Sequence, residues 1–179
     1  MTCIIALRDG QKTWLGGDSA ATDGMETTLV AQPKVFVKSG VGVGVCGSPR
    51  VLDLLTHQLE IPPPPEAVRS LHKWMVMEFI NAVRSCFKAG GVAEKAHGAE
   101  QQPSGLLVAV HSKIFHVDTD YQVRVPRDDF DADGCGSPYA LGSLATSVGN
   151  PRKRILTALT ISEHFSNGVR RPFTVICMK

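Results

Sequence analysis

The stretch TCIIALRDGQKTWLGGDS (residues 2–19) decides the fold, because it contains two strands joined by a tight turn. Residues 3–7 form an uninterrupted apolar run, which is typical of a strand that is covered on both faces. The Asp-Gly pair that ends at Gly10 is a turn sequence, and residues 13–17 have the pattern of a returning strand. The sequence therefore predicts a buried hairpin at the start of the chain.

Strands and helices continue to alternate in blocks along the rest of the chain. Further strands are expected at residues 35–37, 41–46, 105–110, 114–117, 121–125 and 173–178, and helices at 49–59, 66–89, 137–147 and 151–165. Residues 92–104 are expected to be a surface loop. This order predicts an α+β fold: a four-layer α-β-β-α sandwich of two antiparallel sheets, with residues 1–179 forming a single domain.

The composition narrows the class of protein. The 179 residues include 19 Lys and Arg against 17 Asp and Glu, a net charge of +2, and 43% are hydrophobic. This balance argues against a disordered chain and gives no basic footprint for nucleic acid. The longest uncharged run, residues 134–151, is broken by Gly and Pro, so no membrane helix is expected.

The beginning of the chain and its cysteines point to one compartment. The first residues lack the basic leader of a secretory signal. The five cysteines are scattered and form neither a disulfide framework nor a paired metal motif. We therefore expect a cytoplasmic protein.

Thr2 is the first candidate catalytic residue. Removal of the initiator Met before a small residue would leave Thr2 with a free α-amine beside its own hydroxyl. An N-terminal Thr can use that amine as the general base for the hydroxyl. An unperturbed α-amine titrates at about pH 7.7–8.0, so a useful fraction is unprotonated near neutrality. By itself, however, a Met-Thr beginning indicates nothing about function.

Three further residues make chemical sense beside Thr2. If the hairpin turns near Gly10, antiparallel pairing places Asp18 almost opposite Thr2. A Lys34 ammonium near the Thr2 hydroxyl would lower the pKa of that hydroxyl, while Asp18 keeps the lysine charged and oriented. Gly47 lies where a strand leads into a helix, so its backbone N–H can stabilise an oxyanion. Taken singly, these residues also fit a polar loop, a strand-end lysine and a plain turn.

Several short segments share their order and spacing with one protein family. They are residues 2–5 (TCII), 15–24 (LGGDSAATDG), 34–36 (KVF), 45–48 (VCGS), 105–109 (GLLVA), 134–140 (GCGSPYA), and Glu163 with Ser166. Together they resemble a proteasome β-type subunit. The chain is similar to HslV, the bacterial form without a long propeptide, and to related phage-encoded and ancestral-type subunits. The resemblance covers almost the whole chain.

The resemblance implies the fold and the reaction of an N-terminal nucleophile hydrolase. The activity would be that of a threonine endopeptidase, with Thr2 as nucleophile and its amine as base. Asp18 and Lys34 would be the supporting charges, and Gly47 would provide the oxyanion N–H. Peptide substrate would bind as an added strand through Thr22. Residues at the family's main specificity pocket are Ala21, Gln32, Phe36, Val45 and Pro49. Their largely apolar character implies a preference for uncharged side chains.

Other positions depart from the family pattern. Cys135 stands where the family has a serine near the nucleophile, and a thiol is a poorer hydrogen-bond partner than a hydroxyl. Glu163 and Ser166 replace an Asp-x-x-Ser arrangement, so the longer acid would reach differently. The segment after Ser166 lacks the ligand residues of the HslV ion-binding loop. No metal and no cofactor are therefore expected.

The resemblance also implies partners. These are a polypeptide substrate, other copies of the chain in a homo-oligomeric ring or pair of stacked rings, and an ATP-dependent unfoldase. Two alternatives stay open because fold alone does not fix chemistry. One is a noncatalytic ring-forming scaffold, which retention of Met1 would favour, since Thr2 would then have an amide in place of an amine. The other is a small-molecule N-terminal amidohydrolase.

Overall fold

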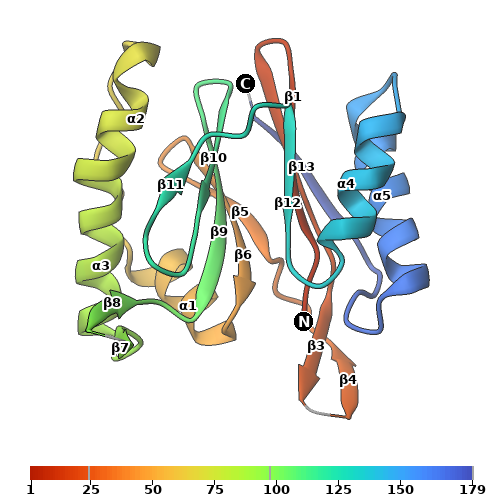
Figure 1. Ribbon diagram of the computed structural model, residues 1–179, viewed down its shortest axis with the longest axis horizontal. Helices are drawn as coiled ribbons and strands as arrows, with labels where there is room; N and C mark the ends of the chain where they lie inside the picture. Colours follow the sequence, from red (N-terminus) through yellow and green to blue (C-terminus); the bar gives the residue numbers. More distant parts are fainter. Residues whose placement is uncertain (24, 97, 179) are drawn as a thin grey trace.

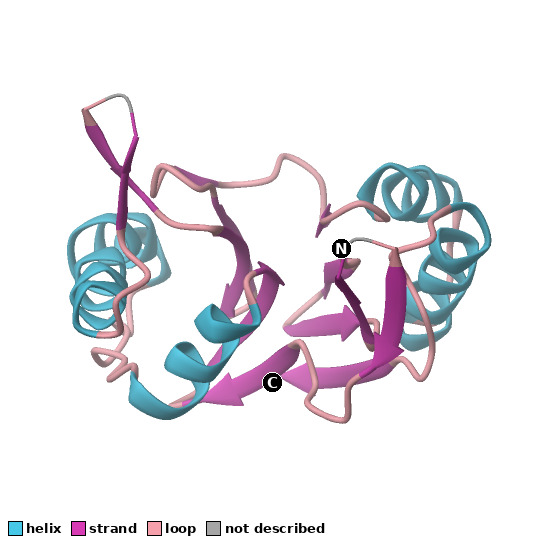
Figure 2. Cartoon of the chain, turned by 90° about the horizontal axis from the view of Figure 1, so that it is seen from below, coloured by secondary structure: helices cyan, strands magenta, loops and turns pink. Residues whose placement is uncertain are grey.

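Two antiparallel sheets face each other at the centre of the molecule. The computed structural model describes residues 1–23, 25–96 and 98–178. Helices cover the outer face of each sheet, as Figure 1 shows from the side and Figure 2 from below. The predicted four-layer α-β-β-α arrangement is therefore confirmed.

The first sheet contains the N-terminal hairpin at its centre. Its strands, in spatial order, are β12 (Phe130–Asp133), β1 (Ile4–Asp9), β2 (Lys12–Gly17) and β13 (Thr174–Met178). Asp9 pairs with Lys12, so the turn lies at the predicted position. A two-residue turn fixes the register, and this register places Asp18 opposite Cys3, whose carbonyl accepts the Asp18 N–H at 3.3 Å. Asp18 therefore lies one position from Thr2 across the ladder, which agrees with the expected placement almost opposite Thr2.

The second sheet is built from the middle of the chain. Its strands, in spatial order, are β11 (Val123–Arg124), β10 (Lys113–Val117), β9 (Ser104–Val110), β6 (Val41–Gly47) and β5 (Val35–Lys38). All neighbouring strands are antiparallel, as predicted. Gly47, at the end of β6, lines the same pocket as Thr2, which lies just before β1.

The helices form the two outer layers. They are α1 (Pro49–Asp53), α2 (Leu71–Trp74), α3 (Ile80–Ala89), α4 (Ser137–Thr146) and α5 (Pro151–Phe165). Leu54–Gln58 continues α1 as a π-helical turn, and Met75–Phe79 joins α2 to α3 in the same way. The α5 helix begins with a side-chain cap, because Asn150 accepts the Lys153 N–H at 3.1 Å.

The apolar core has three layers, and the side chains that alternate along β1 belong to two of them. Ile4 and Ala6 point into the space between the sheets, where they pack against residues such as Leu107. The side chains of Cys3, Ile5 and Leu7 point the other way, toward α4 and α5. A separate cluster fills the space between the second sheet and α1, α2 and α3. β1 is therefore covered on both faces, as its apolar run predicted.

Short polar strands account for the main differences from the predicted layout. The hairpin of β3 (Ala20–Asp23) and β4 (Glu26–Leu29) projects from the body of the molecule (Figure 1). A second hairpin, β7 (Glu94–Ala96) with β8 (Ala99–Gln101), lies in the segment expected to be a loop. These strands lack an apolar face, so backbone pairing, which composition does not reveal, holds them together.

Candidate active site

Thr2 lies just before β1 and is almost fully buried, with 3% of its surface exposed. Its hydroxyl donates to the Met1 carbonyl oxygen at 2.6 Å, and the Met1 amino group donates to the Thr22 hydroxyl at 3.2 Å. While Met1 is attached, the Thr2 nitrogen belongs to a peptide bond and cannot act as a base. In this geometry both the nitrogen and the hydroxyl of Thr2 are engaged with Met1, the nitrogen through the peptide bond and the hydroxyl through its hydrogen bond.

Asp18 is the polar centre of this region. Its side chain is 0% exposed, and its two oxygens accept four hydrogen bonds. Oδ1 accepts the Cys3 N–H at 2.9 Å and the Lys34 ammonium at 2.8 Å. Oδ2 accepts the N–H groups of Ala20 at 2.9 Å and Arg170 at 3.2 Å. A buried carboxylate needs such partners to offset its lost hydration, and here every strong acceptor direction is used.

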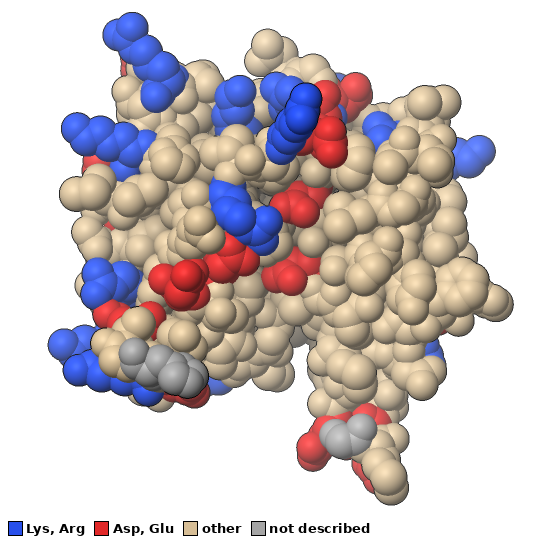
Figure 3. Space-filling model, in the orientation of Figure 1, with Lys and Arg blue, Asp and Glu red and all other residues tan. Residues whose placement is uncertain are grey.

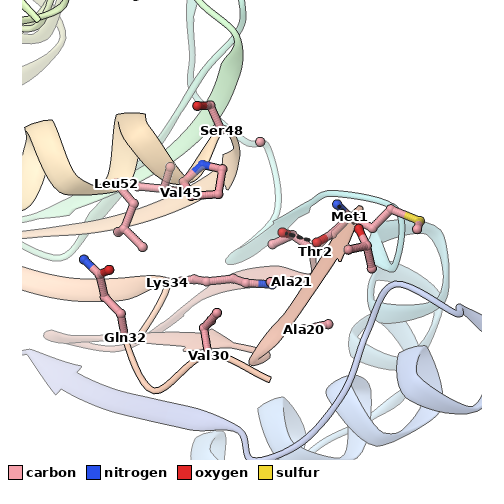
Figure 4. Close-up of a pocket in the computed structure, with 13 residues that line it drawn as sticks. Met1, Thr2, Ala20, Ala21, Val30, Gln32, Lys34, Val45, Ser48 and Leu52 are labelled. Atoms are coloured by element: carbon pink, nitrogen blue, oxygen red, sulfur yellow. Dashed lines mark hydrogen bonds between the residues drawn. The ribbon is translucent and has the colours of Figure 1, made fainter. Parts of the chain in front are cut away.

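Lys34 brings a positive charge to the floor of the site. Its side chain is 9% exposed and forms an ion pair with Asp18 at 2.8 Å. Figure 4 shows Lys34 crossing a pocket with its amino group directed toward Thr2. Thr2 and Lys34 therefore line one pocket, and Lys34 is joined to Asp18 at the side away from solvent.

Gly47 lines the same pocket, at the end of β6. Its φ of 128° lies in the region that only glycine adopts easily, and a Cβ there would stand 2.5 Å from the Pro103 carbonyl oxygen. The next N–H group, that of Ser48, donates to the Ser104 hydroxyl at 3.0 Å and is therefore already committed. Gly47 stays the candidate oxyanion donor.

The pocket beside Thr2, called the first pocket below, contains most of the predicted specificity residues. Ala21, Thr22, Gln32, Val45 and Pro49 all line it, together with Val30 and Leu52, which the sequence analysis missed. Leu52 lies on α1, one turn beyond Pro49, so the helical period brings both side chains toward the pocket. Apolar carbons dominate the walls, and Figure 4 places Gln32 at the far end from Thr2.

Phe36 does not line the first pocket, which corrects its expected role. It lies on β5, whereas Lys34 precedes that strand. There it packs against the core between the second sheet and its helices. Phe36 therefore supports the wall of the site from behind and does not face a ligand.

Cys135 and Ser166 stand on the other side of Thr2. The Cys135 thiol contacts the Thr2 carbonyl oxygen at 3.4 Å, and the Ser166 hydroxyl donates to the Cys135 sulfur at 3.2 Å. Cys135 is exposed, unlike the groups around Asp18. A short hydrogen-bonded chain thus connects Thr2 to the end of α5.

Glu163 is turned away from that chain and reaches Arg171 instead. Its carboxylate accepts the Arg171 backbone N–H at 2.9 Å and pairs with the Arg171 guanidinium at 2.7 Å. These contacts hold the pKa of Glu163 below its usual value. The neighbouring Arg170, which the sequence analysis missed, donates its N–H to Asp18 and its guanidinium to the Ser166 carbonyl at 3.1 Å. No local motif signals this contact.

Two thiols near Thr2, the buried Cys3 and the partly buried Cys46, have low reactivity. Burial raises the pKa of Cys3 to about 12, and burial also raises the pKa of Cys46 to about 12. Both therefore stay protonated at neutral pH and are poor nucleophiles. This leaves the Thr2 hydroxyl as the candidate nucleophile beside Lys34.

No group of three or more His, Cys, Asp or Glu within residues 1–23, 25–96 and 98–178 is placed to hold a metal ion. Over the same residues, no helix combines the length and the apolar character needed to span a bilayer.

The fold of this chain is similar to those of several solved structures. No protein-family model matches the sequence. BPH from Thiobacillus denitrificans, which has also been solved in complex with epoxomicin, matches with a TM-score of 0.80 and 19% identity over 99% of this chain and 98% of that chain. HslV from Trypanosoma brucei matches with a TM-score of 0.75 and 19% identity over 99% of each chain. Anbu, the ancestral β-subunit from Yersinia bercovieri, matches with a TM-score of 0.67 and 14% identity over 98% of this chain and 81% of that chain. The chain therefore has the fold of the HslV-like, proteasome β-type proteins.

Proposed function

We propose that the protein is a threonine peptidase in which Thr2, freed by removal of Met1, is the nucleophile. The observation that carries the proposal is the buried Asp18–Lys34 pair, which holds a cation on the floor of a pocket that Thr2 lines. Burying two charges is costly, and such pairs concentrate at sites where charge is used in chemistry.

The reaction follows from the groups in place. Removal of Met1 turns the Thr2 amide into an amine, which takes the proton from the hydroxyl as the hydroxyl oxygen attacks the peptide carbonyl. The Lys34 ammonium stabilises the negative charge that develops on the attacking oxygen. The oxyanion that forms on the substrate faces the Gly47 N–H. When this intermediate collapses, the C–N bond breaks and the proton passes to the leaving amine.

An ester between Thr2 and the substrate acyl group then remains. Water attacks this ester, and the Thr2 amine again serves as base, which restores the free hydroxyl. In this scheme Cys135 and Ser166 hold the Thr2 carbonyl and thereby orient the nucleophile, whereas Asp18 orients Lys34.

The surroundings of Thr22 favour a peptide over a small-molecule substrate. Among the described strands, β3 pairs only with β4, so the other edge of β3 is open to an added strand. Thr22 lies on β3 and lines the first pocket beside Thr2. A substrate in extended form would place one side chain in this largely apolar pocket, which supports a preference for uncharged residues before the cleaved bond.

We also propose that the chain assembles into a homo-oligomeric ring, or two stacked rings, that is fed by an ATP-dependent unfoldase. The support is the shared fold with HslV-like proteins. Native mass spectrometry would test the assembly: a closed ring gives one discrete high mass, and a monomer at micromolar concentration contradicts it.

The nucleophile can be identified by labelling. Protein whose loss of Met1 is verified by intact mass is treated with a peptide epoxyketone, and the adduct is located by peptide mapping. We expect one adduct per chain on Thr2, and none in Thr2→Ala. An adduct on Cys135, or no peptide cleavage by protein that lacks Met1, would overturn the proposal. Retention of Met1 in the native protein would favour a noncatalytic scaffold.

A further inference from the structure

A second pocket opens on the opposite side of Thr2 from the first. Val45 and Gly47 face the first pocket, and because side chains alternate along a strand, Cys46 faces the second. Gly134 lies between Thr2 and Cys46: a Cβ on Gly134 would stand 2.2 Å from the Thr2 carbonyl oxygen and 3.1 Å from the Cys46 sulfur. Cys46, which lines the second pocket, is therefore close to the backbone of Thr2, which lines the first.

We call this second site the acidic pocket, after the side chains that line it. Those used below are Cys46, Ser104, His116, Asp118, Thr119 and Asp133. They come from the facing ends of both sheets. Figure 3 shows Asp and Glu side chains gathered near the middle of this face, around a basic side chain.

His116 is buried at the wall of the acidic pocket, with its side chain 8% exposed. Its Nδ1 lies 2.8 Å from the Asp131 carboxylate and is held by it. Its Nε2 lies 3.7 Å from Asp133 and 3.8 Å from Asp118, and it makes no hydrogen bond with any described residue. When Nδ1 carries the proton that binds Asp131, Nε2 presents a lone pair toward the pocket.

The carboxylates around His116 exceed the cations that face them. Asp118 pairs with Arg124 at 2.5 Å, and this contact holds the pKa of Asp118 below its usual value. Asp133 uses Oδ1 to accept the Gly134 N–H at 2.7 Å, but Oδ2 has no Lys or Arg partner among the described residues. Three carboxylates thus face one guanidinium and one imidazole, so the pocket stays negative even when His116 is protonated.

Two acceptors in the pocket therefore have no donor among the described Lys and Arg residues. They are Nε2 of His116 and Oδ2 of Asp133, 3.7 Å apart, whereas both oxygens of Asp118 accept from Arg124. The described residues provide no set of three ligands placed for a metal ion. A group with several N–H donors and a positive charge satisfies these acceptors, as an ammonium or guanidinium does.

We propose that the acidic pocket binds the basic side chain of a lysine or arginine that follows the cleaved bond in the substrate. This inference rests on the proposed peptidase function. Residues before the cleaved bond would lie along β3 and fill the first pocket. The leaving part of the chain continues past Thr2 on the other side, where the acidic pocket opens beside Cys46.

Matched peptides test this specificity. A fluorogenic peptide with lysine directly after the cleaved bond is compared with otherwise identical peptides that have norleucine or ε-acetyl-lysine there. We expect kcat/KM for the lysine peptide to exceed that for the norleucine peptide about tenfold, because a charge-assisted hydrogen bond forms only with the lysine. The acetyl-lysine peptide keeps the length of the side chain but loses its charge, and it should behave like the norleucine peptide.

A pair of variants locates the effect. Asp133→Asn keeps an acceptor for the Gly134 N–H but removes the charge, and it should bring the lysine-to-norleucine ratio close to one. Asp128→Asn removes an exposed acid outside the pocket and should leave the ratio unchanged. Because the ratio is measured within one preparation, partial unfolding of a variant cancels.

Each outcome decides between distinct claims. If the protein without Met1 cleaves none of the peptides, the proposed function fails. If it cleaves all of them at equal rates, or Asp133→Asn keeps the lysine preference, only the basic-residue inference fails. If Asp133→Asn does not fold, the comparison of lysine with acetyl-lysine in the unaltered protein decides, since equal rates there refute the inference.

Discussion

The two halves of the candidate active site differ in burial and in how completely their polar groups are hydrogen-bonded. The half that contains Asp18 and Lys34 is buried, and both carboxylate oxygens of Asp18 are saturated with donors. The half that contains Cys135 and Glu163 is more exposed, and Glu163 is engaged by Arg171 at the surface. From this difference we expect substitutions of Asp18 or Lys34 to be costly. We expect the half with Cys135 and Glu163 to accept changes more readily, as its thiol and its redirected acid indicate.

The largest effect should follow loss of the Lys34 charge. Lys34→Met leaves Asp18 buried without its cation, so we expect the free energy of unfolding to fall by about 3–5 kcal/mol. Peptide hydrolysis should fall at least about a hundredfold, because the cation near Thr2 is lost. Urea denaturation and kcat/KM measure the two effects.

A second variant separates stability from chemistry in the same pair. Lys34→Met combined with Asp18→Asn removes the unpaired charge and should recover part of the lost stability without recovering activity. Recovery of activity in the double variant would show that the buried pair has only a structural role. The two halves of the site would then not differ in their importance for activity.

Gly47 offers the next test of the buried half, the one that contains Asp18 and Lys34. In Gly47→Ala the new Cβ would meet the Pro103 carbonyl, and the backbone would be strained at a φ of 128°. Displacing the candidate oxyanion donor should lower kcat about a hundredfold. Gly40→Ala is the matched control: Gly40 also has a positive φ, 76°, but a Cβ there has open space. It should cost about 1 kcal/mol of stability through strain alone and leave kcat unchanged.

Cys135→Ser tests the more exposed half, the one that contains Cys135 and Glu163. A hydroxyl is the better hydrogen-bond partner for both the Thr2 carbonyl and Ser166, so kcat/KM should stay level or rise about two- to threefold. Cys177→Ser, at an exposed thiol on β13, is the control for a general effect of removing sulfur. A drop of a hundredfold in Cys135→Ser alone would place the thiol among the indispensable groups and reverse the comparison.

The smallest effect should come from Glu163. The pKa of this acid is lowered by Arg171, so its contribution to stability is present above its unfolded pKa and is lost as pH falls through the lower folded value. Arg171 is largely exposed, so Glu163→Gln should cost at most about 1 kcal/mol at pH 7. The gap in unfolding free energy between the two proteins should close between pH 7 and pH 3. A gap that widens in acid would contradict the assigned ion pair.

The sequence predicted those parts of the molecule that apolar alternation or turn chemistry controls. The hairpin at β1 and β2 lies where its turn residues placed it, and the spacing of Asp18 and Lys34 from Thr2 led to the buried pair. The strands of the β3–β4 hairpin were missed because they are polar and partly exposed.

Contacts between residues far apart in the sequence are the second reason why parts of the site could not be predicted. Glu163 binds Arg171 and Arg170 binds Asp18 because the loop after α5 folds back, which no local pattern records. The family resemblance implied that Phe36 lines the specificity pocket, but its side chain packs against the core between the second sheet and its helices, which a matching position in the sequence does not reveal.

The fourth hydrogen bond of Asp18 has a consequence for the folding of the chain. Arg170 donates that bond, and both the Arg170 carbonyl and the Pro172 carbonyl accept bonds from Ser19, next to Asp18. Three of the four groups that hold the Asp18 carboxylate belong to the first 34 residues, and the fourth belongs to the segment just before β13. The Asp18 site is therefore complete only when the two ends of the chain have come together, and it reports on the folding of the whole first sheet.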